Sequence, residues 1–190
     1  MNIAFFAVAF AAAIATLSAQ MPSASRPPVT FTKDGKLRQP DGYRRWVYAG
    51  TPITPNDMNA GKAAFPEFHA VYIDPSAYDH YAKTGQFPDG AVIVKELLSV
   101  GAKKATSGNG YFMGEFTGLE VAIKDSTRFR DEPGNWAFFS FGHKYPLQKQ
   151  SAAQATTSCN ACHGANAGDD FVFTQYYPVL RAAKASAGKR

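Results

Sequence analysis

The stretch AVIVKELLSV (residues 91–100) decides the fold class of this chain. Its β-branched and aliphatic residues, uninterrupted by Gly or Pro, are typical of a strand inside a sheet. Side chains alternate between the two faces of a strand, so one face carries Ile93, Lys95, Leu97 and Ser99 and the other carries Val92, Val94, Glu96, Leu98 and Val100. Lys95 therefore lies in the middle of an apolar strand. Either its ammonium group extends to the sheet edge and the residue has no functional role, or the lysine has a functional role at this position.

Three further stretches, rich in β-branched and aromatic residues, predict strands on both sides of this one. They are residues 68–73, 111–124 and 135–143. A Pro-Gly turn at residues 133–134 separates the last two, and the basic, glycine-rich segment 101–110 is a flexible connection. Consecutive strands with short links favour an antiparallel sheet over a parallel one.

Helices are predicted at three places. Residues 41–48 begin with a capping Asp and continue with bulky side chains, which predicts a short helix. Asp74-Pro75 predicts the start of a second helix, because Asp caps the N-terminus and Pro at the first helical position lacks only an unpaired N–H. That helix ends at Gly85, a residue suited to a left-handed cap. Residues 169–183 predict a closing helix, interrupted at Pro178.

Residues 1–20 have the character of an export signal. Residues 3–16 are almost wholly apolar, and Leu17-Ser18-Ala19 offers small residues for cleavage. The n-region has no Lys or Arg, so an uncleaved N-terminal anchor is the alternative. The apolar segment is short for a membrane span, and no later stretch qualifies. We expect a periplasmic protein in which residues 21–40 are an extended lead-in and residues 41–190 form one domain.

The run Cys159-Asn160-Ala161-Cys162-His163 is the attachment signature of a c-type haem. Each thiol can bond one vinyl group of the porphyrin, and His163 then lies beneath the iron as an axial ligand. The chain has only these two cysteines, so a zinc site lacks its further ligands, and a redox dithiol would not need the histidine. We expect one covalently bound haem c per chain, in an α+β domain with a mainly antiparallel β-sheet, a few flanking helices and the haem motif near the C-terminus.

The formal net charge of +5 is spread along the chain, without a basic run interleaved with aromatic residues. Nucleic-acid binding is therefore not expected. A mildly basic surface suits an acidic redox partner, but it is equally common among soluble exported proteins.

Several stretches together resemble the cytochrome P-460 family, which includes the β-sheet cytochromes c′ (cytochrome c′-β). They cover most of the mature chain: residues 43–46, 71–75, 94–96, 107–114, 118–120, 133–138, 159–163 and 173–184. The resemblance implies a five-coordinate c-type haem on an antiparallel sheet, usually in a homodimer. In the enzymes of the family a strand lysine is also bonded to a porphyrin meso carbon, and the haem oxidises hydroxylamine and binds nitric oxide. In the c′-β relatives the lysine bond is absent and binding of nitric oxide replaces turnover.

The resemblance assigns roles to three side chains outside the haem motif. Lys95, in the matching VKE, is the candidate for the porphyrin cross-link. Glu120 matches the distal base, and we expect desolvation to raise its pKa; the alternative is a solvated glutamate on an exposed face. By strand alternation its neighbours on that face are Phe112, Phe116, Gly118 and Ala122. His69 stands where family enzymes carry a basic residue, often Arg, and a structural role in the strand is the alternative.

The expected function is oxidation of hydroxylamine to nitrous oxide, nitric oxide or nitrite, with Glu120, Lys95 and His69 at the catalytic site and electrons passed to a redox partner such as a small cytochrome c. One alternative is a nitric-oxide-binding protein without turnover, favoured by Phe112, Phe116, Phe138 and Phe139. The other is a plain electron carrier, which needs a sixth ligand such as Met58 or Met113; strand alternation turns Met113 away from Glu120, which argues against it. His80 and His143 are expected to be structural.

Overall fold

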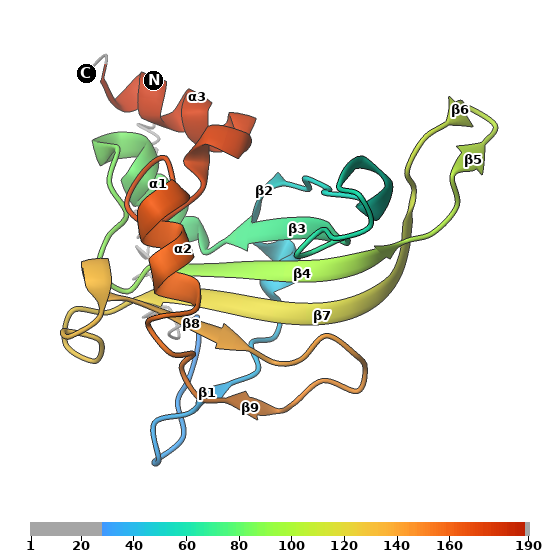
Figure 1. The fold of residues 1–190 in the computed structure, drawn as a ribbon. Coiled ribbons are helices and arrows are strands. Elements are labelled where there is room, and N and C mark those ends of the chain that lie inside the picture. Colours follow the sequence, from blue (N-terminus) through green and yellow to red (C-terminus); the bar gives the residue numbers. More distant parts are fainter. Residues whose placement is uncertain (1–27, 189–190) are drawn as a thin grey trace, which may run out of the picture.

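The computed structural model describes residues 28–188 and is built around a five-stranded sheet (Figure 1). The strand order is β2-β3-β4-β7-β8, and every neighbouring pair is antiparallel. The strands are Val47–Gly50 (β2), Phe68–Ile73 (β3), Val92–Val100 (β4), Met113–Lys124 (β7) and Trp136–Ser140 (β8). The predicted α+β class with a mainly antiparallel sheet is confirmed. The predicted export signal lies outside the described residues.

The register of the sheet aligns one residue from each of its last four strands: Val71, Lys95, Glu120 and Ser140. Directly opposed residues of antiparallel strands point to the same face of the sheet. The face that carries this row is named the site face below. It also carries His69 and Phe138, each two residues from the row on its own strand.

Three helices gather at one end of the strands and pack on the site face: Pro75–Thr84 (α1), Cys159–Asn166 (α2) and Pro178–Ala187 (α3) (Figure 1). Helix α1 begins as predicted, because the Asp74 carboxylate accepts a hydrogen bond from the backbone N–H of Ala77 at 3.1 Å. It ends as predicted at Gly85, whose φ of 73° is left-handed. The apolar cluster beneath the helices includes Ile73, Tyr81, Trp136 and Leu180, all fully buried.

A second apolar cluster covers the opposite face, where β4, β7 and β8 meet the N-terminal segment. Leu37 of the short strand β1 (Leu37–Arg38) is fully buried there, and β1 pairs with β9 (Gln150–Ser151). Glu96 is also buried on this face, and its carboxylate accepts hydrogen bonds from the Tyr43 hydroxyl at 2.6 Å and from the Arg44 guanidinium. Glu96 is thus a paired structural carboxylate, on the other side of the sheet from Glu120.

Two helix predictions were wrong in their extent. Of residues 41–48 only Tyr43–Arg45 (η1) forms a 3-10 turn, because Val47–Gly50 pairs with β3 instead. Sheet pairing here outweighs the local preference. Of residues 169–183 only the part from Pro178 onward is α-helical; Pro178 occupies the first helical position, and the extended Tyr177 precedes it. The remaining 3-10 turns are Asn56–Met58 (η2), Pro133–Asn135 (η3) and Thr174–Tyr176 (η4).

A β-bulge changes the face of the first half of β7. Leu97 opposes Gly118 but Leu98 opposes Phe116, so Thr117 is an extra residue in the ladder. Phe116 therefore faces away from Glu120, and its ring lies 4.3 Å from the Arg44 guanidinium carbon on the opposite face. The prediction that Phe116 shares a face with Glu120 was wrong, because strand alternation holds only while the ladder is regular. Phe112 lies before β7 begins.

The predicted flexible connection between β4 and β7 is a short hairpin that projects from the sheet (Figure 1). Its strands are Lys104–Ala105 (β5) and Gly108–Asn109 (β6), and their residues are exposed. Within residues 28–188, no helix combines the length and the apolar character that crossing a bilayer requires.

Candidate functional site

The C-x-x-C-H motif forms helix α2, which lies against β8 at the end of the site face. Asn160, between the two cysteines, is 2% exposed, and its amide nitrogen donates a hydrogen bond to the backbone carbonyl of Trp136 at 2.7 Å. This bond fixes the helix to the sheet. Cys159 packs against the core while Cys162 is exposed, and the two thiols form no disulfide. Both thiols are therefore available to bond a porphyrin edge, as the motif requires.

His163 is held in an apolar setting with one ring nitrogen occupied. Its Nδ1 lies 2.7 Å from the carbonyl oxygen of Phe171, which only accepts, so Nδ1 carries the proton and Nε2 carries the lone pair. The rings of Phe138 and Phe173 lie 4.3 and 4.7 Å from the imidazole, centroid to centroid. Burial lowers the pKa of His163 below its ordinary value. A neutral imidazole with a defined Nε2 lone pair is the form that binds a metal.

Further along the site face, Glu120 lies between two basic side chains. Its Oε2 is 2.5 Å from the ammonium nitrogen of Lys95, its direct neighbour on β4. Its Oε1 is 3.0 Å from Nε2 of His143, which follows β8. The Lys95 ammonium also lies 4.3 Å from the ring centroid of Phe65, a cation–π contact. The chain therefore places a carboxylate, an amine and an imidazole together on a partly apolar surface.

The direction of the Glu120 pKa shift corrects the expectation from sequence. Burial alone raises the pKa of this carboxyl, but the charge and hydrogen bond of Lys95, together with His143, outweigh burial and hold the pKa below its ordinary value. With a free lysine beside it, Glu120 is ionised at neutral pH. The sequence shows the apolar neighbours of Glu120 but not the contact with Lys95, which depends on the register of two strands.

His69 lies on the same face, one strand beyond Lys95. Burial, assisted by the positive charge of Lys95, lowers the pKa of His69 to about 4. The imidazole is therefore neutral at neutral pH, and its Nε2 is buried without a hydrogen-bond partner among the described residues. The Phe65 ring meets it edge-on at 5.9 Å between centroids. An unpaired buried nitrogen is costly in a finished core, and it fits a pocket whose occupant is not a protein side chain.

Two side chains of this group were missed from sequence. His143 was expected to be structural, and Phe65 was not singled out; both lie outside the strands, and long-range packing brings them to Glu120 and Lys95. The two candidate methionine ligands do not join the group, because Met58 and Met113 are 76% and 56% exposed. Within the described chain no three His, Cys, Asp or Glu residues gather as a metal site.

The site face thus presents His163 near one end and the group of Lys95, Glu120, His143 and His69 beyond it. Phe138 links the two parts, since it contacts His163 and lies two residues from the position opposite Glu120. A metal-binding imidazole beside two free cysteines, a partnerless buried nitrogen and an apolar sheet between them fit a haem. These features define the class of protein: a cytochrome whose haem motif follows the strands of an antiparallel sheet in the sequence and packs on one face of that sheet.

The profile of the family Cytochrome P460 matches residues 40–174, which is most of the chain. The chain belongs to this family, and haem is therefore its cofactor. The resemblance noted in the sequence is confirmed at the level of the family. No curated protein compared with the chain gives a significant match.

Proposed function

We propose that this protein is an exported c-type haem enzyme that oxidises hydroxylamine. Cys159 and Cys162 would hold the haem covalently, and His163 would ligate its iron through Nε2. The observation that carries the proposal is the position of Glu120, partly buried on the site face between Lys95 and His143. A site that only bound a neutral gas would have no use for a carboxylate in this place.

The side chains of the site face would have different roles in this reaction. Haem held by Cys159, Cys162 and His163 would supply a redox-active iron that can accept electrons from the substrate. Glu120 would accept protons from hydroxylamine, since the lowered pKa of its carboxyl keeps it ionised. His143 holds the Glu120 carboxylate in place. His69 is neutral, so it positions a polar ligand through a hydrogen bond and not through charge.

Lys95 is proposed to bond the porphyrin edge through Nζ: the new N–C bond would replace one N–H bond of the neutral amine and one porphyrin C–H bond, with two electrons passed to an external oxidant and two protons to solvent. Its central place on β4, a contact with the Phe65 ring and a position on the site face support this role. The bond would give the protein a means to adjust the electronic character of the haem. It would also withdraw the ammonium group that lowers the pKa of Glu120, so that this carboxyl becomes a stronger base.

The nitric-oxide-binding alternative draws less support than the sequence suggested. Phe116 and Phe139 pack on the opposite face, and Phe138 contacts His163. The electron-carrier alternative needs a sixth ligand, and both candidate methionines are exposed. Periplasmic location, a homodimer and a small cytochrome c as electron acceptor belong to the same proposal.

Turnover by the purified holoprotein tests the proposal directly. Hydroxylamine should be consumed, and an added electron acceptor reduced, in proportion to the protein present. The same protein incubated with nitric oxide serves as a comparison. Tight binding of nitric oxide without any consumption of hydroxylamine would favour the binding protein over the enzyme.

A further inference from the structure

The chain just after helix α2 makes an unusual turn. Asp170 and Phe171 both have positive φ, 43° and 60°. The backbone N–H of Val172 donates to the carbonyl of Asp169 at 2.7 Å, which closes the turn. Two successive left-handed residues are characteristic of a type I′ turn, where Gly, Asn and Asp are favoured and a bulky residue such as Phe is not. Something outside the turn must hold Phe171 in this conformation.

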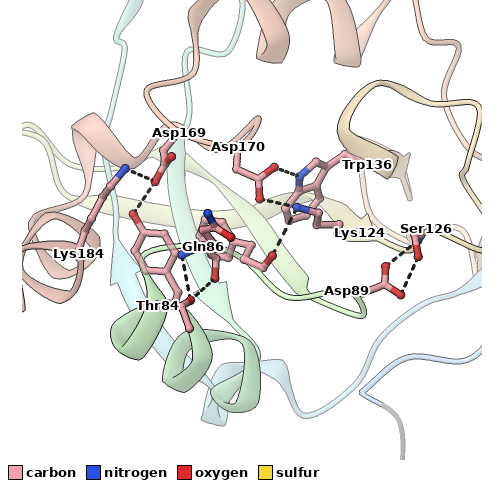
Figure 2. A network of polar contacts seen from close by, with 11 residues as sticks. Thr84, Gln86, Asp89, Lys124, Ser126, Trp136, Asp169, Asp170 and Lys184 are labelled. Atoms are coloured by element: carbon pink, nitrogen blue, oxygen red, sulfur yellow. Dashed lines mark hydrogen bonds and ion pairs between the residues drawn. The ribbon is translucent and has the colours of Figure 1, made fainter. Parts of the chain in front are cut away.

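The side chain of Asp170 supplies that hold. Its Oδ2 lies 2.7 Å from the ammonium nitrogen of Lys124, and its Oδ1 accepts a hydrogen bond from the indole N–H of Trp136 at 3.2 Å. Lys124 and Trp136 are register partners at the ends of β7 and β8. Figure 2 shows Asp170 reaching both of them. One carboxylate therefore fixes the turn to two strands of the sheet.

Two further contacts lock the same turn. Asp169 accepts hydrogen bonds from the Tyr81 hydroxyl at 3.0 Å and from the Lys184 ammonium at 2.8 Å, which ties the turn to α1 and α3 (Figure 2). The Phe171 ring lies against two glycines: a Cβ on Gly134 would come within 2.6 Å of it, and a Cβ on Gly164 within 3.0 Å. The ring is thus confined between the turn before β8 and helix α2.

Together these contacts fix the position of one backbone atom, the carbonyl oxygen of Phe171. The carbonyl oxygen of Phe171 is the group that accepts the Nδ1 proton of His163 at 2.7 Å. We propose that Asp170 is a positioning residue for the axial histidine: by anchoring the left-handed turn to Lys124 and Trp136, it aims the Phe171 carbonyl at Nδ1 of His163. The proposal rests on His163 being the haem ligand, as proposed above. It does not depend on turnover of hydroxylamine.

The expected consequence is electronic. A strong acceptor on Nδ1 makes the imidazole a better donor to iron and fixes the plane of its ring. Better donation stabilises ferric over ferrous haem, so an aimed Phe171 carbonyl lowers the reduction potential. Loss of the anchor should raise the potential and weaken the iron–histidine bond.

The test measures the haem and not its activity. Asp170→Ala removes both anchors, whereas Asp170→Asn keeps an acceptor for the Trp136 indole and a residue that tolerates left-handed φ. The matched control is Asp57→Ala, since Asp57 also accepts from one lysine and one aromatic side chain, Lys103 at 2.7 Å and the Tyr111 hydroxyl at 2.8 Å, on an exposed surface of the protein. Each holoprotein is examined by redox titration and by resonance Raman of the ferrous iron–histidine stretch.

We expect Asp170→Ala to shift the potential upward and the iron–histidine stretch to lower frequency, with a smaller shift of the same sign in Asp170→Asn and none in Asp57→Ala. If Asp170→Ala yields no folded holoprotein, Asp170→Asn decides. Potentials and stretching frequencies equal to those of Asp57→Ala would overturn the positioning role. If the wild-type protein holds no haem, the proposed function is overturned instead. If it holds haem but does not turn over hydroxylamine, the redox and Raman measurements still decide the role of Asp170.

Discussion

Lys95 and Glu120 lie directly opposite each other on β4 and β7, and the ammonium nitrogen is 2.5 Å from a carboxylate oxygen. A buried glutamate alone would be a weak acid, yet this one has a pKa below its ordinary value because Lys95 and His143 outweigh its burial. The state of the lysine therefore controls the state of the base. A charged Lys95 keeps Glu120 ionised, but its ammonium group then pairs with the carboxylate. If Lys95 were bonded to the porphyrin, the Glu120 carboxylate would be free to accept a proton from substrate.

Replacement of Glu120 should separate substrate binding from chemistry. General-base assistance typically contributes about a hundredfold or more to the rate, so Glu120→Ala and Glu120→Gln should lower kcat for hydroxylamine by about that factor. Binding of hydroxylamine or nitric oxide, followed by absorbance, should persist because His163 is untouched. Glu115→Gln is the control, an exposed glutamate on the same strand. Unchanged turnover in Glu120→Ala would move the base elsewhere, with His69 and His143 next to examine.

The haem motif predicts covalent attachment. Acidified acetone should extract no haem from the wild-type protein, because thioether bonds to Cys159 and Cys162 survive acid. Cys159→Ala or Cys162→Ala should weaken retention, while His163→Ala should leave attachment and alter the iron ligation seen by absorbance. Ser158→Ala serves as the control next to the motif. Haem that extracts fully from the wild-type protein would contradict the c-type assignment.

Local signals predicted much of the fold. The strand at residues 91–100 and the helix from Asp74 to Gly85 follow from side-chain alternation and from caps, which need only neighbouring residues. Where distant parts of the chain compete, the sequence misled. Val47–Gly50 became a strand because β3 offered it a partner, and Phe116 changed face because Thr117 adds a residue to the ladder.

The candidate site shows the same division. Cys159, Cys162 and His163 are adjacent in sequence, so their motif could be found directly. Phe65 and His143 are not, and they join the site only through packing around β3, β4 and β7. The turn behind His163 was predicted as part of a helix; its strained conformation is sustained by contacts from β7 and β8, which no local pattern reveals.

The buried His69 should make stability depend on pH. Its pKa is about 4 in the folded protein against an ordinary 6.5, so between these values the unfolded chain binds a proton that the folded chain does not. Unfolding is thus favoured as pH falls from 6.5 toward 4, by at most about 3 kcal/mol. In urea titrations at pH 7.5 and 4.5, His69→Gln should lose part of this pH dependence. His80→Gln, at an exposed position on α1, should retain it; equal pH dependence in both variants would reject the assignment.

The cross-link to Lys95 is the prediction with the most direct readout. After proteolysis, mass spectrometry should find the peptide containing Cys159 and Cys162 joined through haem to the peptide containing Lys95, and the ferrous absorption band should be strongly red-shifted. Lys95→Arg keeps a cation beside Glu120 but has no amine that can form this bond, so it should give two separate peptides and the spectrum of an ordinary c-type haem. Lys103→Arg, an exposed lysine paired with Asp57, should behave as wild type. Separate peptides and an ordinary spectrum in the wild-type protein would favour the nitric-oxide-binding alternative, and Lys95 and Glu120 of this chain would then remain an ion pair.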